Sequence, residues 1–236
     1  QHFTHALLEV LGLESEVDRV RLTTHTARLG VFPMGVDARH LDRLSRERGV
    51  MRRVAAIRHE ALGRRILLGI DRLDYTKGIL RRLMAFERLL EESPEQCGRL
   101  RLIQVAVPSR EEIPDYQAHR GEVEALVGRI NGTYGTVDAA PIHYLHQSLS
   151  PQELIALYRA AHVMLVTPMR DGMNLVAKEF VAARSDDEGV LVLSEFAASR
   201  GVDTIPMLRQ AIAIFDRVVA RDAAHYNAAR ALTIAY

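Results

Sequence analysis

Residues 71–78 (DRLDYTKG) hold two cations in a polar turn between an apolar run and a helical pattern. Arg72 and Lys77 could both face an anion there, and the amides and positive dipole end of the following helix would add to the attraction. Arginine binds two phosphate oxygens at once, whereas lysine acts as a point charge. The alternative is a solvated turn with an Arg–Asp surface pair, which the spacing alone slightly favours. The glycine spacing of a Walker A loop is absent.

A second polar turn, residues 108–110 (PSR), follows another apolar run. A third cation at Arg110 would complete a basic pocket at one end of a sheet. The alternative, which this turn favours when it is taken alone, is that Arg110 pairs with Glu111 or Glu112 in solvent.

A third candidate lies in residues 168–179 (PMRDGMNLVAKE). Gly172 would let the backbone approach a ligand closely, and Asn174 could cap the helix that follows. A carboxylate at a strand end can accept hydrogen bonds from the two hydroxyls of a vicinal diol, as acidic residues do for ribose in dinucleotide folds. Asp171 could act in this way, or it could be a second helix cap.

Glu179 is the other carboxylate of this segment, in the second turn of the predicted helix. It could also bind a diol, or it could form an ion pair with Lys178 or Arg184. The helix is mostly apolar, and a carboxylate among buried neighbours needs a partner, which makes Glu179 harder to dismiss as a binding residue.

Composition and charge narrow the remaining chemistry. The 236 residues are 48% apolar and 26% charged, as in globular proteins, and the net charge of +1 gives no electrostatic footprint for nucleic acid. The ten histidines show no HxxxH or HExxH spacing and Cys97 is the single cysteine, so we predict no metal. No apolar run approaches the ~20 residues of a membrane span, so no membrane partner is predicted, and a lone cysteine suits the cytoplasm. The sequence leaves open whether the chain forms a homo-oligomer.

Five apolar runs alternate with helical patterns from residue 64 onward. The runs are residues 65–70, 101–107, 141–145, 162–167 and 189–194, and the helical patterns are residues 79–90, about 113–130, 150–158 and 174–184. Strands buried on both faces are near-continuously apolar, and short crossovers force them to be parallel. The pattern therefore predicts an α/β fold with a doubly wound, Rossmann-like parallel sheet. Ligands of such sheets bind at the carboxyl ends of the strands, where all three polar turns fall.

The two ends of the chain are less regular. Helices are predicted at residues 2–12, 206–220 and 222–235, and a short strand that runs into a loop at residues 27–36. Residues 38–62 are very basic and suggest exposed helix around a turn near Gly49. The chain begins without a methionine, and we expect it to be part of a longer protein.

The chain contains, in this order, the segments IDRLDYTKGI, VAVPSRE, GRINGTYGT, RDGMNLVAKEFVAAR and GVLVLSEFA. Together they resemble the trehalose-6-phosphate synthase family of retaining glycosyltransferases, glycosyltransferase family 20, over roughly residues 2–198. The resemblance implies the C-terminal, donor-binding half of a GT-B fold. It also implies transfer of glucose from UDP-glucose to glucose-6-phosphate, which gives trehalose-6-phosphate, without a divalent metal.

The resemblance implies roles for five side chains. Arg72 and Lys77 would hold the diphosphate of the donor, and Arg110 would lie beside the phosphates. Asp171 would contact the glucosyl hydroxyls and Glu179 the ribose hydroxyls. Negative charge accumulates on the departing diphosphate, where Arg72 and Lys77 would stabilise it. We therefore expect Arg72, Lys77 and Asp171 to be the catalytic residues.

Backbone amides that follow Asp171 are implied as well. Those around Gly172, Met173 and Asn174 would support the sugar, and those of Leu175 and Val176 the phosphates.

Two departures from the family affect the expected activity. Residues 1–62 resemble only the end of the N-terminal domain, which binds the acceptor in the family, and the crossing into the second domain. Residues 63–198 resemble the nucleotide-sugar-binding domain, and residues 199–236 form a divergent tail that we expect to be helical. The chain alone should therefore bind the donor but turn over little or nothing.

Two other functions stay open. A transferase could use the same donor chemistry on another acceptor, as in glucosylglycerol-phosphate synthase, or could use ADP-glucose or GDP-glucose. The chain could also be a non-catalytic nucleotide-sugar-binding module.

Overall fold

The computed structural model describes residues 9–10, 12, 15–16, 19–30, 34–171, 173–186 and 188–194 of the chain. The chain divides into two compact units, residues 1–34 and residues 35–236. In the first unit, β1 (Ser15–Glu16), β2 (Arg19–Arg21) and β3 (Thr26–Arg28) form an antiparallel sheet.

Two predictions concern the first unit. The short strand that was predicted to run into a loop within residues 27–36 is confirmed, since β3 ends at Arg28 and residues 29–30 and 34–36 are not strand. Of the helix predicted at residues 2–12, only three residues are described, and two of them, Glu9 and Val10, are helical.

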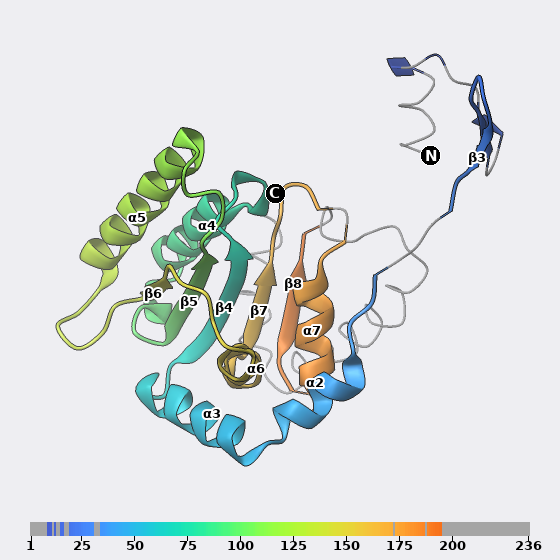
Figure 1. Ribbon diagram of the computed structural model, residues 1–236. Coiled ribbons are helices and arrows are strands. Elements are labelled where there is room, and N and C mark those ends of the chain that lie inside the picture. Colours follow the sequence, from blue (N-terminus) through green and yellow to red (C-terminus); the bar gives the residue numbers. More distant parts are fainter. Residues whose placement is uncertain are drawn as a thin grey trace. The chain divides into compact units, whose positions relative to one another are not determined.

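Five parallel strands form the sheet of the second unit, in the order β6-β5-β4-β7-β8 (Figure 1). The strands are β4 (Arg65–Arg72), β5 (Leu100–Val107), β6 (Ile142–Leu145), β7 (Val163–Val166) and β8 (Val190–Leu193). The connecting helices are α4 (Ile79–Glu92), α5 (Pro114–Tyr134), α6 (Pro151–Ala160) and α7 (Leu175–Ala183). The predicted doubly wound sheet is confirmed. Its order reverses between β4 and β7, and the loops after these two strands bound the position at the carboxyl edge, called the crevice below, where such sheets bind ligands.

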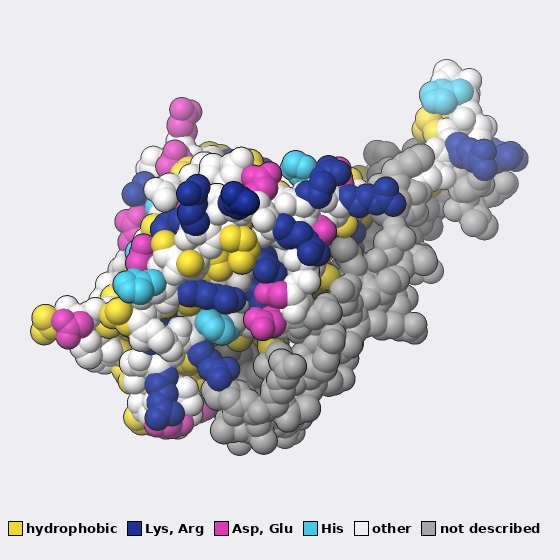
Figure 2. Space-filling view, turned by 90° about the horizontal axis from the view of Figure 1, so that it is seen from below, with side chains coloured by type: hydrophobic (Ala, Val, Ile, Leu, Met, Phe, Trp, Pro, Cys, Tyr) yellow, Lys and Arg dark blue, Asp and Glu magenta, His cyan; other side chains and the backbone are white. Residues whose placement is uncertain are grey.

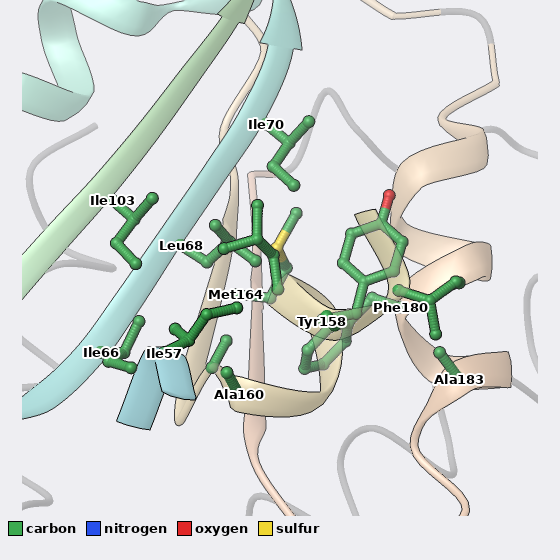
Figure 3. Packing of buried hydrophobic residues seen from close by; sticks show 14 of the residues in the cluster. Ile57, Ile66, Leu68, Ile70, Ile103, Tyr158, Ala160, Met164, Phe180 and Ala183 are labelled. Carbon is green, nitrogen blue, oxygen red and sulfur yellow. The ribbon is translucent and has the colours of Figure 1, made fainter. Parts of the chain in front are cut away.

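Helices cover both faces of the sheet, which explains the continuous apolar runs of its strands. Successive side chains of a strand point to opposite faces, so Leu67 of β4 packs with α4 and α5, whereas Ile66 and Leu68 pack on the other side. Figure 3 shows the second side, where Ile57, Tyr158 and Phe180 of three helices belong to the same cluster as Ile66 and Leu68 of β4. Each fully buried Ile or Leu contributes about 1.5–3 kcal/mol relative to an exposed one.

Residues 38–62 form two helices, α2 (Ala38–Ser45) and α3 (Arg48–Glu60). A turn was predicted near Gly49. The break between the two helices falls slightly earlier, at residues 46–47, and Gly49 lies inside α3. The helices are not exposed all round. Their apolar side chains recur at helical spacing on one face and are buried against α6 and α7, namely Leu44, Val50, Val54 and Ile57.

The outer surface of α2 and α3 is basic. Figure 2, which looks at the second unit from below, shows basic side chains spread over this surface with fewer acidic ones between them, and in α2 and α3 all of these except the histidines are arginines. The exposed arginines of the two helices and of the turn between them are Arg39, Arg43, Arg46, Arg48, Arg52 and Arg58. Both helices belong to the unit that contains the sheet, whereas the resemblance to the family grouped residues 1–62 together. The assignment of residues 1–62 to the end of another domain stays a prediction.

The remaining differences are small. Helix α5 continues through Tyr134, four residues beyond its predicted end. The helices predicted at residues 206–220 and 222–235, and with them the tail from residue 199, lie outside the described residues. Within the described part of the chain, no helix is both long and apolar enough to cross a membrane.

Candidate functional site

The loops after β4 and β7, on either side of the reversal in strand order, are joined at the carboxyl edge of the sheet. Lys77 Nζ lies 2.8 Å from Asp171 Oδ2, and the two side chains are only 15% and 11% exposed. The backbone carbonyl of Thr76 accepts a hydrogen bond of 2.8 Å from the amide of Met169. Two segments that the sequence separates by about ninety residues therefore form one site.

The electrostatics of Asp171 favour its charged form. Partial burial acts to raise the pKa of this carboxyl, but hydrogen bonds from Lys77 and Asn174 and the charge of Lys77 outweigh burial and hold the pKa below its usual range. The Asn174 amide donates to Asp171 Oδ2 over 3.0 Å. A carboxylate held in this way can accept hydrogen bonds from the hydroxyls of a ligand.

Arg72, the last residue of β4, begins the same loop as Lys77, and its charge acts on Asp74 without forming an ion pair. Its side chain is exposed, and among the described residues its guanidinium has no hydrogen bond or ion pair. The alternative of an Arg–Asp surface pair is therefore not met. Asp74 instead caps the short 3-10 helix of residues 75–77 by accepting hydrogen bonds from the Thr76 amide and hydroxyl. Arg72 remains available to an anion.

The start of α4 adds backbone donors to the same place. Gly78 has a φ of 68°, a left-handed conformation that glycine adopts at little cost, and it turns the chain into the helix. No side chain caps α4. Its first amides and dipole therefore come directly after the loop that carries Arg72 and Lys77, and this combination favours a phosphate group.

Arg110 is connected to the first loop rather than paired in solvent. Its guanidinium donates to Tyr116 Oη over 2.8 Å, and the Tyr116 hydroxyl lies 3.4 Å from Asp74 Oδ2. Among the described residues it pairs with neither Glu111 nor Glu112. The φ of 51° at Arg110 is unusual for a residue other than glycine, and such strain clusters at functional sites.

Glu179 lies in the second turn of α7 and accepts a hydrogen bond of 2.9 Å from the Tyr158 hydroxyl. Within the described residues it pairs with neither Lys178 nor Arg184. The Arg184 guanidinium donates instead to four backbone carbonyls, those of residues 158, 159, 161 and 188. Glu179 is therefore not neutralised by a cation, which leaves it able to bind hydroxyl groups.

The predicted backbone donors lie at the start of α7. Asn174 caps the helix, as predicted, by accepting a hydrogen bond of 2.9 Å from the Ala177 amide. Leu175 and Val176 are the first two residues of α7, so their amides are at its amino end. Met173 is described and half-buried, whereas Gly172 lies outside the described residues.

A buried polar cluster beneath the site was missed by the sequence analysis. Arg82 of α4 is 2% exposed and donates to Asp71 Oδ2 at 2.7 Å, to Gln104 Oε1 at 3.0 Å and to Thr167 Oγ1 at 3.0 Å. These partners come from the ends or middles of β4, β5 and the segment after β7. The cluster ties together the strands whose loops form the crevice.

Gly69 makes room for this cluster. A Cβ atom there would lie 2.5 Å from both Arg82 Nη1 and Gln104 Oε1, which is closer than real contacts allow. A glycine and a glutamine within apolar strands, and an arginine in the first turn of an apolar helix face, are the sequence signals that could have indicated the cluster.

His, Cys, Asp and Glu are the side chains that bind metal ions in proteins. In the part of the chain that the structure describes, no three His, Cys, Asp or Glu side chains are grouped so that they could hold a metal ion.

Known proteins resemble the chain in both sequence and structure. The model of "Glycosyltransferase family 20" matches residues 1–214. A trehalose-6-phosphate synthase of Mycobacterium leprae is 50% identical over 192 residues, which are 80% of this chain and 38% of that protein. The UDP-forming alpha,alpha-trehalose-phosphate synthase A of Dictyostelium discoideum is 45% identical over 199 residues, 84% of this chain and 27% of that protein.

Solved structures agree with these matches. A UDP-forming alpha,alpha-trehalose-phosphate synthase from Burkholderia xenovorans in complex with glucose-6-phosphate superposes with a TM-score of 0.78 at 33% identity, covering 99% of this chain and 54% of that one. An E. coli structure bound with UDP-2-fluoro glucose has a TM-score of 0.73 at 32% identity, covering 93% and 51%. The chain thus spans about half the length of these structures, and less of the two curated relatives.

Proposed function

Because the chain belongs to glycosyltransferase family 20, we propose that its crevice is the donor site of a retaining glucosyltransferase. The proposed reaction transfers glucose from UDP-glucose to glucose-6-phosphate and gives trehalose-6-phosphate. The observation that carries the proposal is the ion pair of Lys77 and Asp171, which joins the loop after β4 to the loop after β7 just before the uncapped start of α4. The two similar structures that contain glucose-6-phosphate and UDP-2-fluoro glucose support the choice of substrates.

The diphosphate of the donor would lie between Arg72, Lys77 and the first amides of α4, with Arg110 beside the phosphates. As the glycosidic bond breaks toward an oxocarbenium-like transition state, negative charge grows on the leaving diphosphate. Cations and helix amides fixed in advance at that point stabilise the transition state more than the ground state. The Lys77 ammonium group would then interact with the phosphates as well as with Asp171.

The sugar and the ribose would be held by the other loop. Asp171, charged at neutral pH, would accept hydrogen bonds from glucosyl hydroxyls, and the amides around Gly172, Met173 and Asn174 would support the same ring. The amides of Leu175 and Val176, at the start of α7, would add to the binding of the phosphates.

Glu179 would accept hydrogen bonds from the two ribose hydroxyls, since its carboxylate has no cation as a partner among the described residues. The acceptor hydroxyl would attack from the face that the leaving group occupies, and the phosphate itself would take the proton, so no carboxylate acts as nucleophile. We propose no metal cofactor, because Arg72, Lys77 and the helix amides supply positive charge at the phosphates.

The proposed partners are therefore a nucleotide sugar and, through residues outside this chain, glucose-6-phosphate. We propose neither a nucleic-acid nor a membrane partner, and we propose the cytoplasm as the compartment.

Calorimetric titration of the purified chain with UDP-glucose, ADP-glucose and GDP-glucose tests the proposal. We expect saturable binding of UDP-glucose, weakened about ten- to a hundredfold by Arg72→Ala and by Glu179→Ala, since each removes a charge-assisted hydrogen bond. Arg88→Ala is the matched control, because Arg88 is an exposed arginine further along α4. Tighter binding of another nucleotide sugar would correct the donor, and no binding by a folded chain would overturn the proposal.

A further inference from the structure

The hydroxyl of Tyr158 is a polar group at the edge of an apolar core. Tyr158 is 0% exposed, and its ring meets that of Phe180 edge to face at 6.1 Å and 85°. Figure 3 shows the ring between α6 and α7, with its oxygen directed toward the carboxyl end of the sheet, at the level of Ile70. The ring thus anchors a hydroxyl that points from the core toward the candidate site.

This hydroxyl has one acceptor, Glu179 Oε2, at 2.9 Å. Burial and the nearby charge of Glu179 raise the pKa of Tyr158 well above its usual value, so the hydroxyl stays protonated and donates. Among the residues that the structure describes, Tyr158 is the one hydrogen-bond partner of the Glu179 carboxylate. A glutamate has three rotatable bonds, and a fixed donor on one oxygen limits the orientations that the carboxylate can adopt.

The bond leaves acceptor capacity for a ligand. An ionised carboxylate has about four lone-pair positions, of which Tyr158 uses one on Oε2. Oε1 and the rest of Oε2 can still accept two hydrogen bonds, which is the number that a vicinal diol donates. The orientation of the carboxylate then decides whether both bonds form at once.

We propose that Tyr158 is a positioning residue that orients Glu179 to accept both ribose hydroxyls and so gives the site its preference for ribonucleotides. The proposal rests on the proposed function of Glu179 and deepens it. A site built to hydrogen-bond a hydroxyl discriminates against ligands that lack it, because the buried acceptor is then left without a partner.

A second Tyr–Glu pair of the chain supplies the control. Tyr134 Oη lies 3.2 Å from Glu91 Oε1. Tyr134 is the last residue of α5, which leads to the amino end of β6, so this pair lies away from the carboxyl edge of the sheet. Tyr158→Phe and Tyr134→Phe each remove one hydroxyl and keep the ring. A general effect of losing a Tyr–Glu bond would appear in both variants.

The test compares UDP with 2′,3′-dideoxy-UDP, which lacks both ribose hydroxyls, by calorimetry of the full chain. We expect the wild-type chain to bind UDP more tightly, Tyr158→Phe to weaken UDP binding about fivefold, and neither Tyr158→Phe nor Tyr134→Phe to change dideoxy-UDP binding. In a Glu179→Ala background, Tyr158→Phe should cause no further loss, because the residue it positions is gone.

Three results would overturn the proposal. If Tyr158→Phe weakens both ligands equally, the hydroxyl serves only the fold. If the wild-type chain discriminates and Tyr158→Phe leaves the ratio unchanged, the role of Tyr158 is wrong while the donor site stands. If the folded wild-type chain binds neither ligand, the donor site itself is wrong and the role of Tyr158 falls with it.

Discussion

Arg72 and Lys77 bring charge to the same crevice in different states. Lys77 is largely buried and its charge is balanced by Asp171, whereas Arg72 is exposed and unpaired within the described residues. Desolvating a cation is costly unless a counter-charge accompanies it, so the largely buried Lys77 has Asp171 as its partner. The exposed one needs no partner until an anion arrives. Arg72 and Lys77 therefore differ in their surroundings: Lys77 is partly buried and paired, whereas Arg72 is exposed and has no ion pair among the described residues.

His162 is the residue for which we predict a pH effect on stability. Its Nδ1 accepts a hydrogen bond of 3.0 Å from the Ile66 amide, so the folded chain needs the neutral ring. Burial, followed by the charges of Arg58, Arg65 and Arg184, lowers the pKa of His162 from 6.5 to about 4. The unfolded chain therefore binds a proton more readily between these values, and the contribution of His162 is complete above pH 6.5 and is lost as the pH falls toward 4.

Urea unfolding at several pH values measures this effect. Because solvent screens the exposed part of the ring, the lowered pKa of His162 corresponds to about 1–2 kcal/mol in the free energy of unfolding. In His162→Asn, which keeps a polar side chain but cannot titrate, the fall in stability between pH 6.5 and 4 should be smaller by that amount. An unchanged fall in the variant would show that His162 does not titrate in the folded chain as described.

Arg82 fixes the strands that carry the loops of the site. One guanidinium joins β4, β5 and the segment after β7, so the crevice loops begin from strands that are fixed relative to one another. Each bond to the charged group contributes about 1.5–3 kcal/mol where both partners are buried and paired.

Gly69→Ala tests whether the cluster around Arg82 depends on the absence of a side chain at Gly69. The added methyl group would push Arg82 Nη1 and Gln104 Oε1 away from their positions, and we expect a loss of about 1–3 kcal/mol in the free energy of unfolding.

Gly128→Ala is the control for Gly69→Ala. Gly128 is exposed within α5 and has nothing within 4 Å of an added Cβ, so alanine there should stabilise the helix by about 0.5–1 kcal/mol. Equal effects of the two changes would mean that Arg82 and Gln104 adapt without cost.

Most elements of the sheet unit were predictable, because strands buried on both faces and amphipathic helices leave strong local patterns. The strand at residues 65–70 and the cap at Asn174 are examples. The burial of α2 and α3 was not predictable in the same way, since a basic helix with one apolar face does not reveal what covers that face. The Arg82 cluster joins residues up to 85 positions apart, and no local pattern encodes such a contact.

Charge is distributed unevenly over the described surface although the net charge of the chain is only +1. The outer surface of α2 and α3 is rich in arginine (Figure 2). Several arginines of this region are bound within the chain, among them Arg53 to Glu153 at 2.8 Å and Arg46 to Asp42 at 2.9 Å. The crevice differs from this surface because its loop places Arg72 and Lys77 directly before the uncapped start of α4, so we expect anions to bind there in preference to the helical surface.

The whole chain is expected to bind donor without transferring glucose. The resemblance assigns the acceptor site to the N-terminal domain of the family, and residues 1–62 resemble only the end of it. An assay for UDP released from UDP-glucose should therefore show no increase when glucose-6-phosphate is added to the 236-residue chain. Release of UDP that depends on glucose-6-phosphate would contradict this expectation and would place an acceptor site within these residues.

The most direct test of the donor site is a crystal structure of the chain with UDP. We predict the diphosphate at the start of α4, within hydrogen-bonding distance of Arg72 and Lys77, and the ribose hydroxyls on Glu179. A nucleotide bound elsewhere, or one that leaves both Arg72 and Lys77 without contact to phosphate, would contradict the assignment of the crevice.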